Sequence, residues 1–92
     1  MKEDYRDECE ILKAIAHPVR LKIIELLIKG FPSEECRVSS IQNRLDLPQS
    51  TVSQHLQILK SKGIIDGSKS GLEVCYKVID TRAVKILQIL RK

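Results

Sequence analysis

The segment from Leu47 to Lys60 constrains this 92-residue chain most, because its residues divide between two sides of one predicted helix. One side is apolar and needs a core to pack against; it carries Val52, His55, Leu56 and Leu59. The other side carries short uncharged polar residues, namely Ser50, Ser53, Gln54 and Gln57. Such side chains can read the base edges of a DNA major groove. A polar surface without a ligand fits the same pattern, so the flanking sequence must decide.

A shorter predicted helix, from Val38 to Leu45, precedes this segment and is expected to open with a serine cap. Pro48 cannot continue that helix, but its fixed φ suits the start of the next one. Two helices joined by so tight a bend form a helix-turn-helix. The second helix, residues 49–62, is then placed to enter a DNA groove.

Two strands are predicted after the helix-turn-helix. Gly63, a glycine directly after the last apolar turn of the helix, is the expected C-cap. Residues 64–68 and 72–78 are predicted to follow as strands, with a turn at 69–71. In the second strand, apolar Leu72, Val74, Tyr76 and Val78 alternate with Glu73, Cys75 and Lys77, as expected for a half-buried strand. A helix-turn-helix followed by a hairpin, here a wing at residues 66–73, predicts a winged helix.

Three blocks of the sequence together resemble a known family. They are His17 to Leu27, then Thr51 to Leu56 with Leu59-Lys60 and Gly63 to Ile65, then Gly71 to Tyr76. In this order and spacing they are similar to the ArsR/SmtB family, the arsenical-resistance-repressor class of winged-helix transcription factors. The resemblance runs from about Glu8 to Leu90. It implies a small homodimeric regulator, usually a repressor, that binds an inverted repeat and is released by a metal ion, an oxidant or another signal.

The expected architecture is mainly α with a small β-hairpin (α+β): four helices, the hairpin and a last helix, in one domain spanning residues 1–92. The charge agrees with a double-stranded DNA partner. Sixteen Lys and Arg against twelve Asp and Glu give +4, and since the first ten residues carry −3, the remainder carries +7. A protein that binds no DNA could carry the same net charge for solubility alone. The sequence has neither a secretory signal nor an apolar run of the ~20 residues that span a bilayer, so we expect a cytoplasmic protein without a membrane partner and with reduced cysteines.

The last helix, predicted from Thr81 to about Arg91 and capped by Asp80, indicates a homodimer. Its apolar residues cover roughly 220° of the helical wheel, about twice the ~100° that a one-sided helix needs. The excess predicts a second copy of the chain, packed beside the first helix, at about residues 4–16. A last helix embedded in one subunit is the alternative. The expected dimer residues are Leu12, Ile86, Leu87, Ile89 and Leu90.

A two-fold dimer would place its two groove-binding helices ~34 to 36 Å apart, which predicts an operator that is an imperfect palindrome. Gln54 is the best candidate for reading a base, while serines at the start of the preceding helix and Lys69 on the wing suit phosphates. His55 is expected to pack or to position the helix. The full set of expected DNA contacts is Ser39, Ser40, Gln49, Ser50, Thr51, Ser53, Gln54, Gln57, Lys60 and Lys69.

No metal ligand or cofactor is expected. Where the best-known metal sensors of the family carry a Cys-x-Cys pair, this chain has Arg37 and Ser39, and no histidine follows Asp80-Thr81-Arg82, where other members open a zinc site. Cys36, beside Arg37 in a loop predicted to be exposed, is the first candidate for an oxidant-sensitive thiol. Cys9 and Cys75 are further redox candidates. The competing interpretation is that none of the three cysteines has a function.

The sequence does not predict an enzyme, since it contains no Gly-rich phosphate loop and no nucleophile paired with a base. Two alternatives to a plain DNA-binding repressor remain. One is a redox-responsive repressor that uses Cys36. The other is a winged helix that binds proteins, although such a helix would expose aromatic or aliphatic anchors rather than serine and glutamine.

Overall fold

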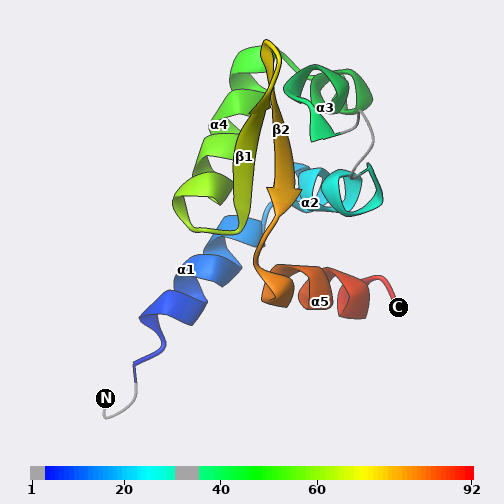
Figure 1. Ribbon diagram of the computed structural model, residues 1–92. Helices are drawn as coiled ribbons and strands as arrows, with labels where there is room; N and C mark the ends of the chain where they lie inside the picture. The colour runs from blue at the N-terminus through cyan, green and yellow to red at the C-terminus, as the bar shows by residue number, and fades with distance from the viewer. Residues whose placement is uncertain (1–3, 31–35) are drawn as a thin grey trace.

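The computed structural model describes residues 4–30 and 36–92 and has the predicted winged helix-turn-helix architecture (Figure 1). Most of the predicted loop at 31–37 lies outside the described residues. The elements, in chain order, are α1 (Arg6–Ile15), α2 (Pro18–Gly30), α3 (Val38–Leu45), α4 (Gln49–Ser61), β1 (Ile65–Ser70), β2 (Glu73–Val78) and α5 (Thr81–Leu90).

The helix α2 forms the centre of the core. It contacts each of the other helices and β2. It therefore buries Ile23, Ile24, Leu26 and Leu27, each at most 2% exposed. Ile41 of α3 and Leu59 of α4 complete this centre with no exposed surface. The described residues pack around one core, which holds the helix-turn-helix and the hairpin in fixed positions.

Local sequence signals set several element ends as expected. Gly63 has φ +71°, and its N–H and that of Ile64 donate to the carbonyls of Lys60 and Leu59 at the end of α4, both at 3.0 Å. The side chain of Asp80 accepts a hydrogen bond from the Arg82 N–H at 2.9 Å and caps α5. The predicted serine cap of α3 is wrong. Its N-cap is Arg37, which makes no side-chain cap hydrogen bond.

The two strands pair antiparallel, from Ile65 opposite Val78 to Ser70 opposite Glu73. The hairpin turns at Gly71 and Leu72, two residues later than the start of the predicted turn, and Gly71 has φ +67°. Glycine adopts such a φ without strain, which places the reversal there. Leu72, expected on the half-buried face of the second strand, is fully exposed at the tip.

The elements separate into two ends of the molecule (Figure 1). At one end lie α3, the first turns of α4 and the tip of the hairpin; at the other lie α1 and α5, with the two termini. Within residues 4–30 and 36–92, no helix combines the length and the apolar character needed to cross a membrane. The first end carries the predicted DNA contacts apart from Lys60, in the last turn of α4, and the second end carries the predicted dimer contacts.

Candidate nucleic-acid interface

The helix α4 has the two contrasting sides that its sequence predicts. Its inner side is part of the core, where Val52, Leu56 and Leu59 are at most 2% exposed. On the outer side, Thr51 is half-buried and the other polar residues are exposed: Gln49, Ser50, Ser53, Gln54, Gln57 and Lys60. Within the described part of the chain, the Ser and Gln side chains of this stripe make no hydrogen bond. Their donors and acceptors are therefore available to a ligand.

A groove of about 340 Å³ lies between α3, the start of α4 and the hairpin. Its lining includes Ser39, Gln49, Ser53 and Glu73. The bend between the two helices forms at Asp46, which has φ +54° and whose N–H donates to the Gln42 carbonyl at 2.9 Å. Two residues of the polar stripe of α4, Gln49 and Ser53, thus line one opening together with the start of α3 and the wing.

The start of α3 lies against a carboxylate that the sequence pattern did not place there. The exposed Ser39 hydroxyl, predicted to bind phosphate, donates a hydrogen bond to Glu73 Oε1 of β2 at 2.7 Å. The Arg37 guanidinium lies 3.5 Å from the other carboxylate oxygen. Ser40 is half-buried beside them. Glu73 therefore occupies part of the surface that a phosphate would use.

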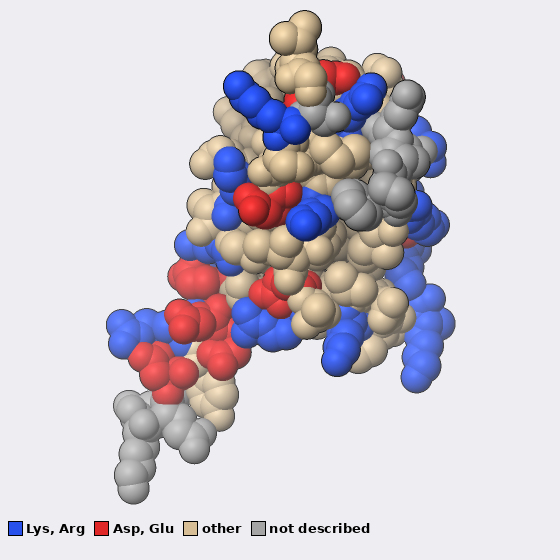
Figure 2. Space-filling model, in the orientation of Figure 1, with Lys and Arg blue, Asp and Glu red and all other residues tan. Residues whose placement is uncertain are grey.

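Lys69 adds a basic side chain next to this surface, and the largest group of acidic residues lies on α1. Lys69 is exposed on β1 near the hairpin tip, opposite Val74. Lys62, directly after α4, forms an ion pair with Glu10 of α1 at 2.9 Å. Figure 2 shows the largest group of acidic side chains around α1, at the lower left, and smaller acidic groups among the Lys and Arg on the rest of this face. A polyanion would meet the α4 and wing end of the molecule with little repulsion from α1.

His55, on the inner edge of α4, holds the helix to the preceding elements, in agreement with its predicted positioning role. Its Nδ1 accepts a hydrogen bond from Arg20 Nε at 3.2 Å, and Arg20 also donates to the Ala14 carbonyl at 2.9 Å. The His17 ring lies 4.5 Å away, centre to centre. Burial lowers the pKa of His55, and the neighbouring His17 and Arg20 lower it further. The neutral imidazole is therefore the form that accepts the Arg20 hydrogen bond.

The terminal helices leave apolar side chains in solvent. Ile89 and Leu90 on α5 are 67% and 65% exposed, and Leu12 on α1 is 51% exposed. Ile86 is half-buried. Leu87, also predicted at a dimer interface, is only 8% exposed and packs in the core of its own chain. One edge of α5 thus packs within the subunit and another edge remains uncovered.

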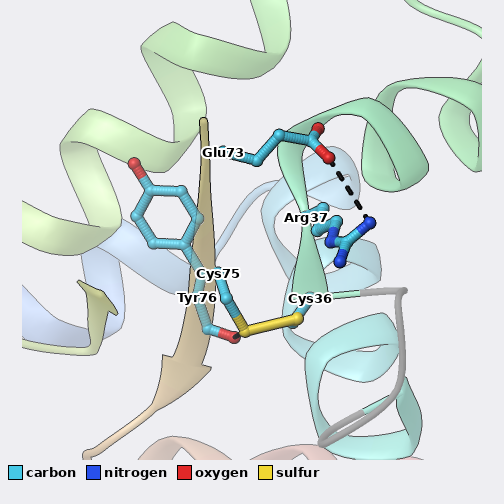
Figure 3. Close-up of a disulfide and its surroundings, with 5 residues drawn as sticks. All are labelled: Cys36, Arg37, Glu73, Cys75 and Tyr76. Atoms are coloured by element: carbon cyan, nitrogen blue, oxygen red, sulfur yellow. Dashed lines mark hydrogen bonds and ion pairs between the residues drawn. A yellow bond between two sulfur atoms is a disulfide. The ribbon is translucent and has the colours of Figure 1, made fainter. Parts of the chain in front are cut away.

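Two cysteines are joined, which corrects the expectation of three reduced, separate thiols. Cys36 and Cys75 form a disulfide across 39 residues of sequence (Figure 3). Cys36 is 4% exposed rather than lying in an exposed loop, because its neighbour Arg37 pairs with Cys75 in an antiparallel bridge that extends the hairpin. Cys9 remains a free, exposed thiol on α1. In the described ranges, no three His, Cys, Asp or Glu residues form a group that could hold a metal ion.

Comparison with known proteins identifies the class of site. Residues 17–66 match the profile of the family described as bacterial regulatory protein, arsR family. The transcriptional repressor PagR of Bacillus anthracis is 39% identical over 84 residues, which cover 91% of this chain and 81% of PagR. The HTH-type transcriptional repressor SmtB of Mycobacterium tuberculosis is 41% identical over 78 residues, which cover 85% of this chain and 55% of SmtB.

Solved structures give the same result. The crystal structure of PagR superimposes with a TM-score of 0.77 at 38% identity, covering 91% of this chain and 92% of that one. The solution structure of a homodimeric winged helix-turn-helix DNA-binding domain, Mb0332 from Mycobacterium bovis, gives 0.77 at 25% identity, covering 92% and 75%. These relatives are regulators of transcription rather than enzymes, as the sequence predicted. Their descriptions favour neither the protein-binding nor the redox alternative.

Proposed function

Because the chain belongs to the arsR family of bacterial regulatory proteins, we propose that it is a homodimeric transcriptional repressor that binds an imperfect inverted repeat in double-stranded DNA. The relatives PagR and SmtB are described as transcriptional repressors, and Mb0332 as a homodimeric DNA-binding domain. In this proposal α4 enters the major groove of each half-site. The wing and the start of α3 contact the flanking phosphates.

The observation that carries the proposal is the exposed polar stripe of α4. Its Ser and Gln side chains face solvent without internal hydrogen bonds, beside a groove shared with α3 and the wing. Gln54 is exposed in the middle of the helix and has the amide geometry that pairs with adenine in two hydrogen bonds. A helix that served only as a solvated surface would not need such a groove beside it.

The same proposal assigns the uncovered apolar edge to a second copy of the chain. Leu12 of α1 and Ile89 and Leu90 of α5 are more than half exposed, at the end of the molecule away from the proposed DNA surface. Covering them with the same edge of a second copy would remove their apolar surface from water. The DNA-facing sides of the two α4 helices would then lie on the same side of the dimer, as two half-sites on one face of DNA require.

Selection from a random pool tests the proposal. Purified protein is mixed with random double-stranded DNA, and the bound fraction is amplified and sequenced over several rounds. We expect enrichment of an inverted repeat whose half-site centres lie about 10 to 10.5 base pairs apart. Enrichment of a single unrepeated motif would contradict the dimeric arrangement. Recovery of unenriched sequence would contradict sequence-specific binding.

A further inference from the structure

Two cysteines and a carboxylate lie together where β2 meets the start of α3. We call this group the α3–β2 junction: Cys36, Arg37, Ser39, Glu73 and Cys75. Figure 3 shows all of them except Ser39. The Cα atoms of Cys36 and Cys75 are 4.8 Å apart, within the range that a disulfide spans. The backbone of Arg37 pairs with that of Cys75. The junction therefore ties the first helix of the helix-turn-helix to the wing.

Glu73 and Cys75 act from the same side of β2, because residues two apart on a strand point to the same face. Cys75 reaches Cys36, and Glu73 reaches both Ser39, at 2.7 Å, and Arg37, at 3.5 Å. The Arg37 and Glu73 side chains are 37% and 39% exposed, so the pair lies at the surface rather than in the core. The disulfide holds this strand against α3 and thereby holds the Glu73 carboxylate at the start of α3.

The position of Glu73 matters for DNA. Hydroxyl and backbone N–H groups in the first turn of a helix bind phosphate oxygens, and Ser39 lies in the first turn of α3. In the disulfide-bonded structure this hydroxyl already donates to a carboxylate. A DNA phosphate would have to displace that carboxylate and would be repelled by its charge. The bonded form thus has its own anion in a place where DNA would supply one.

We propose that Cys36 and Cys75 are a reversible thiol–disulfide pair whose oxidation lowers the affinity of the chain for its operator. The inference rests on the DNA-binding function proposed above. Reduction removes the covalent tie between β2 and the start of α3, so that Glu73 can leave Ser39 and Arg37 when a phosphate approaches. Oxidation restores the bond and retains the carboxylate in place.

The chemistry balances with a peroxide as oxidant. The thiolate of Cys75, half-buried and thus more accessible than Cys36, attacks one oxygen of hydrogen peroxide. The O–O bond breaks, a sulfenic acid forms, and hydroxide leaves and becomes water. Cys36 Sγ then attacks the sulfenic sulfur; the S–S bond forms, the S–O bond breaks and the oxygen leaves as a second water with the Cys36 proton. Two electrons pass from the thiols to the peroxide, and a dithiol returns them through a mixed disulfide.

The test compares DNA affinity of the full chain in its two redox states. Protein is reduced with dithiothreitol or oxidised with hydrogen peroxide, the reagent is removed, and the number of free thiols is counted by alkylation and mass spectrometry. Fluorescence anisotropy then gives the Kd on the selected operator across a salt series. We expect the oxidised form to bind about tenfold more weakly, with a salt slope shallower by about 0.9 for each phosphate that the protein no longer neutralises.

Four variants separate the possible causes. Cys36→Ser and Cys75→Ser should bind like the reduced protein whether or not peroxide was added, while Cys9→Ser should respond like the unaltered chain. Glu73→Gln retains both cysteines and the side-chain size but removes the charge. Its oxidised form should recover most of the affinity that oxidation removes from the unaltered chain. Thermal melting of each variant checks that it is folded.

Several results would overturn the inference. Equal affinity of the oxidised and reduced chain, both with the expected thiol counts, would make the bond structural only. Tighter binding by the oxidised form would contradict the inference. If oxidation weakens DNA binding by Glu73→Gln as much as by the unaltered chain, Glu73 has no part in the mechanism. If neither form selects or binds DNA, the proposed function fails and the regulatory inference fails with it. The thiol counts would still show whether the pair forms, so the two failures can be told apart.

Discussion

Gln54 and Lys69 are expected to contribute to DNA binding in different ways. Gln54, exposed on α4, is assigned to a base, so Gln54→Ala should cost ~1 to 3 kcal/mol on the selected operator and much less on random DNA. Lys69, exposed on the wing, is assigned to a phosphate. Lys69→Ala should weaken binding to both DNAs alike and reduce the salt slope by about 1. Fluorescence anisotropy on the two DNAs measures both effects, and equal losses for Gln54→Ala would exclude a base contact.

His55 makes the stability of the fold depend on pH in a defined direction. Burial, with the nearby His17 and Arg20, lowers the pKa of His55 below its ordinary value of 6.5. As the pH falls below that value, the unfolded chain takes up this proton before the folded chain does, so folding loses stability. The contribution is complete above pH 6.5 and is lost as the pH falls toward the folded-state pKa. The free energy of unfolding should therefore be lower at about pH 5.5 than at about pH 7.5.

The control for this prediction is His55→Asn, whose amide oxygen can still accept from Arg20 but does not titrate. Denaturant unfolding at the two pH values should give a smaller difference for the variant than for the unaltered chain. The carboxyl groups with lowered pKa values, such as Asp80 and Glu25, lose their contribution at lower pH, below about 4.5. An equal decrease in both proteins would assign the pH effect to other groups.

At the scale of elements, α5 depends on its cap. Asp80 accepts the Arg82 N–H at 2.9 Å, and its removal leaves that donor unpaired at the start of the helix. Asp80→Ala should therefore cost about 1 kcal/mol, while Asp80→Asn, which retains an oxygen at the cap, should cost less. The ion pair with Arg82 is mostly exposed on the arginine side and adds little. Thermal melting of the two variants would measure the difference, and an equal loss would assign the effect to charge instead.

Elements with strong end signals could be predicted from the sequence. Pro48, Gly63 and Asp80 each act through their own backbone or side-chain chemistry, so the ends of α4 and the start of α5 agree with prediction. The sequence defines the position of the hairpin turn less sharply, because several consecutive residues suit a turn. Its position depends on Gly71, which alone in that stretch adopts a positive φ.

Contacts between distant segments could not be predicted in this way. The alternation in β2 identified Glu73 and Cys75 as one face, but only the three-dimensional packing places that face against α3. The pairing of Cys36 with Cys75 spans 39 residues, and no local pattern encodes it. The predicted serine cap is wrong because α3 begins at Val38, which places Ser39 inside the first turn, where its hydroxyl donates to Glu73.

At the scale of the whole molecule, the apolar edge of α5 predicts the oligomeric state. Ile89 is 67% exposed, and in the proposed dimer it is buried against the second copy. Ile89→Asp would place an unpaired carboxylate in that apolar contact and should give a monomer. Gln88→Asp, which introduces the same carboxylate at the exposed neighbouring position, should leave the dimer intact. Sedimentation velocity distinguishes the two, and an unchanged dimer for Ile89→Asp would place the interface elsewhere.

Operator binding by the proposed dimer requires two α4 helices that enter the major groove on the same face of DNA. The most direct test inserts five base pairs between the half-sites of the selected operator and compares the Kd with that of the original. Half a helical turn moves the second half-site to the opposite face, so we expect affinity to fall by at least about tenfold, to that of an isolated half-site. An affinity unchanged by the insertion would contradict a dimer that holds its two α4 helices at a fixed spacing.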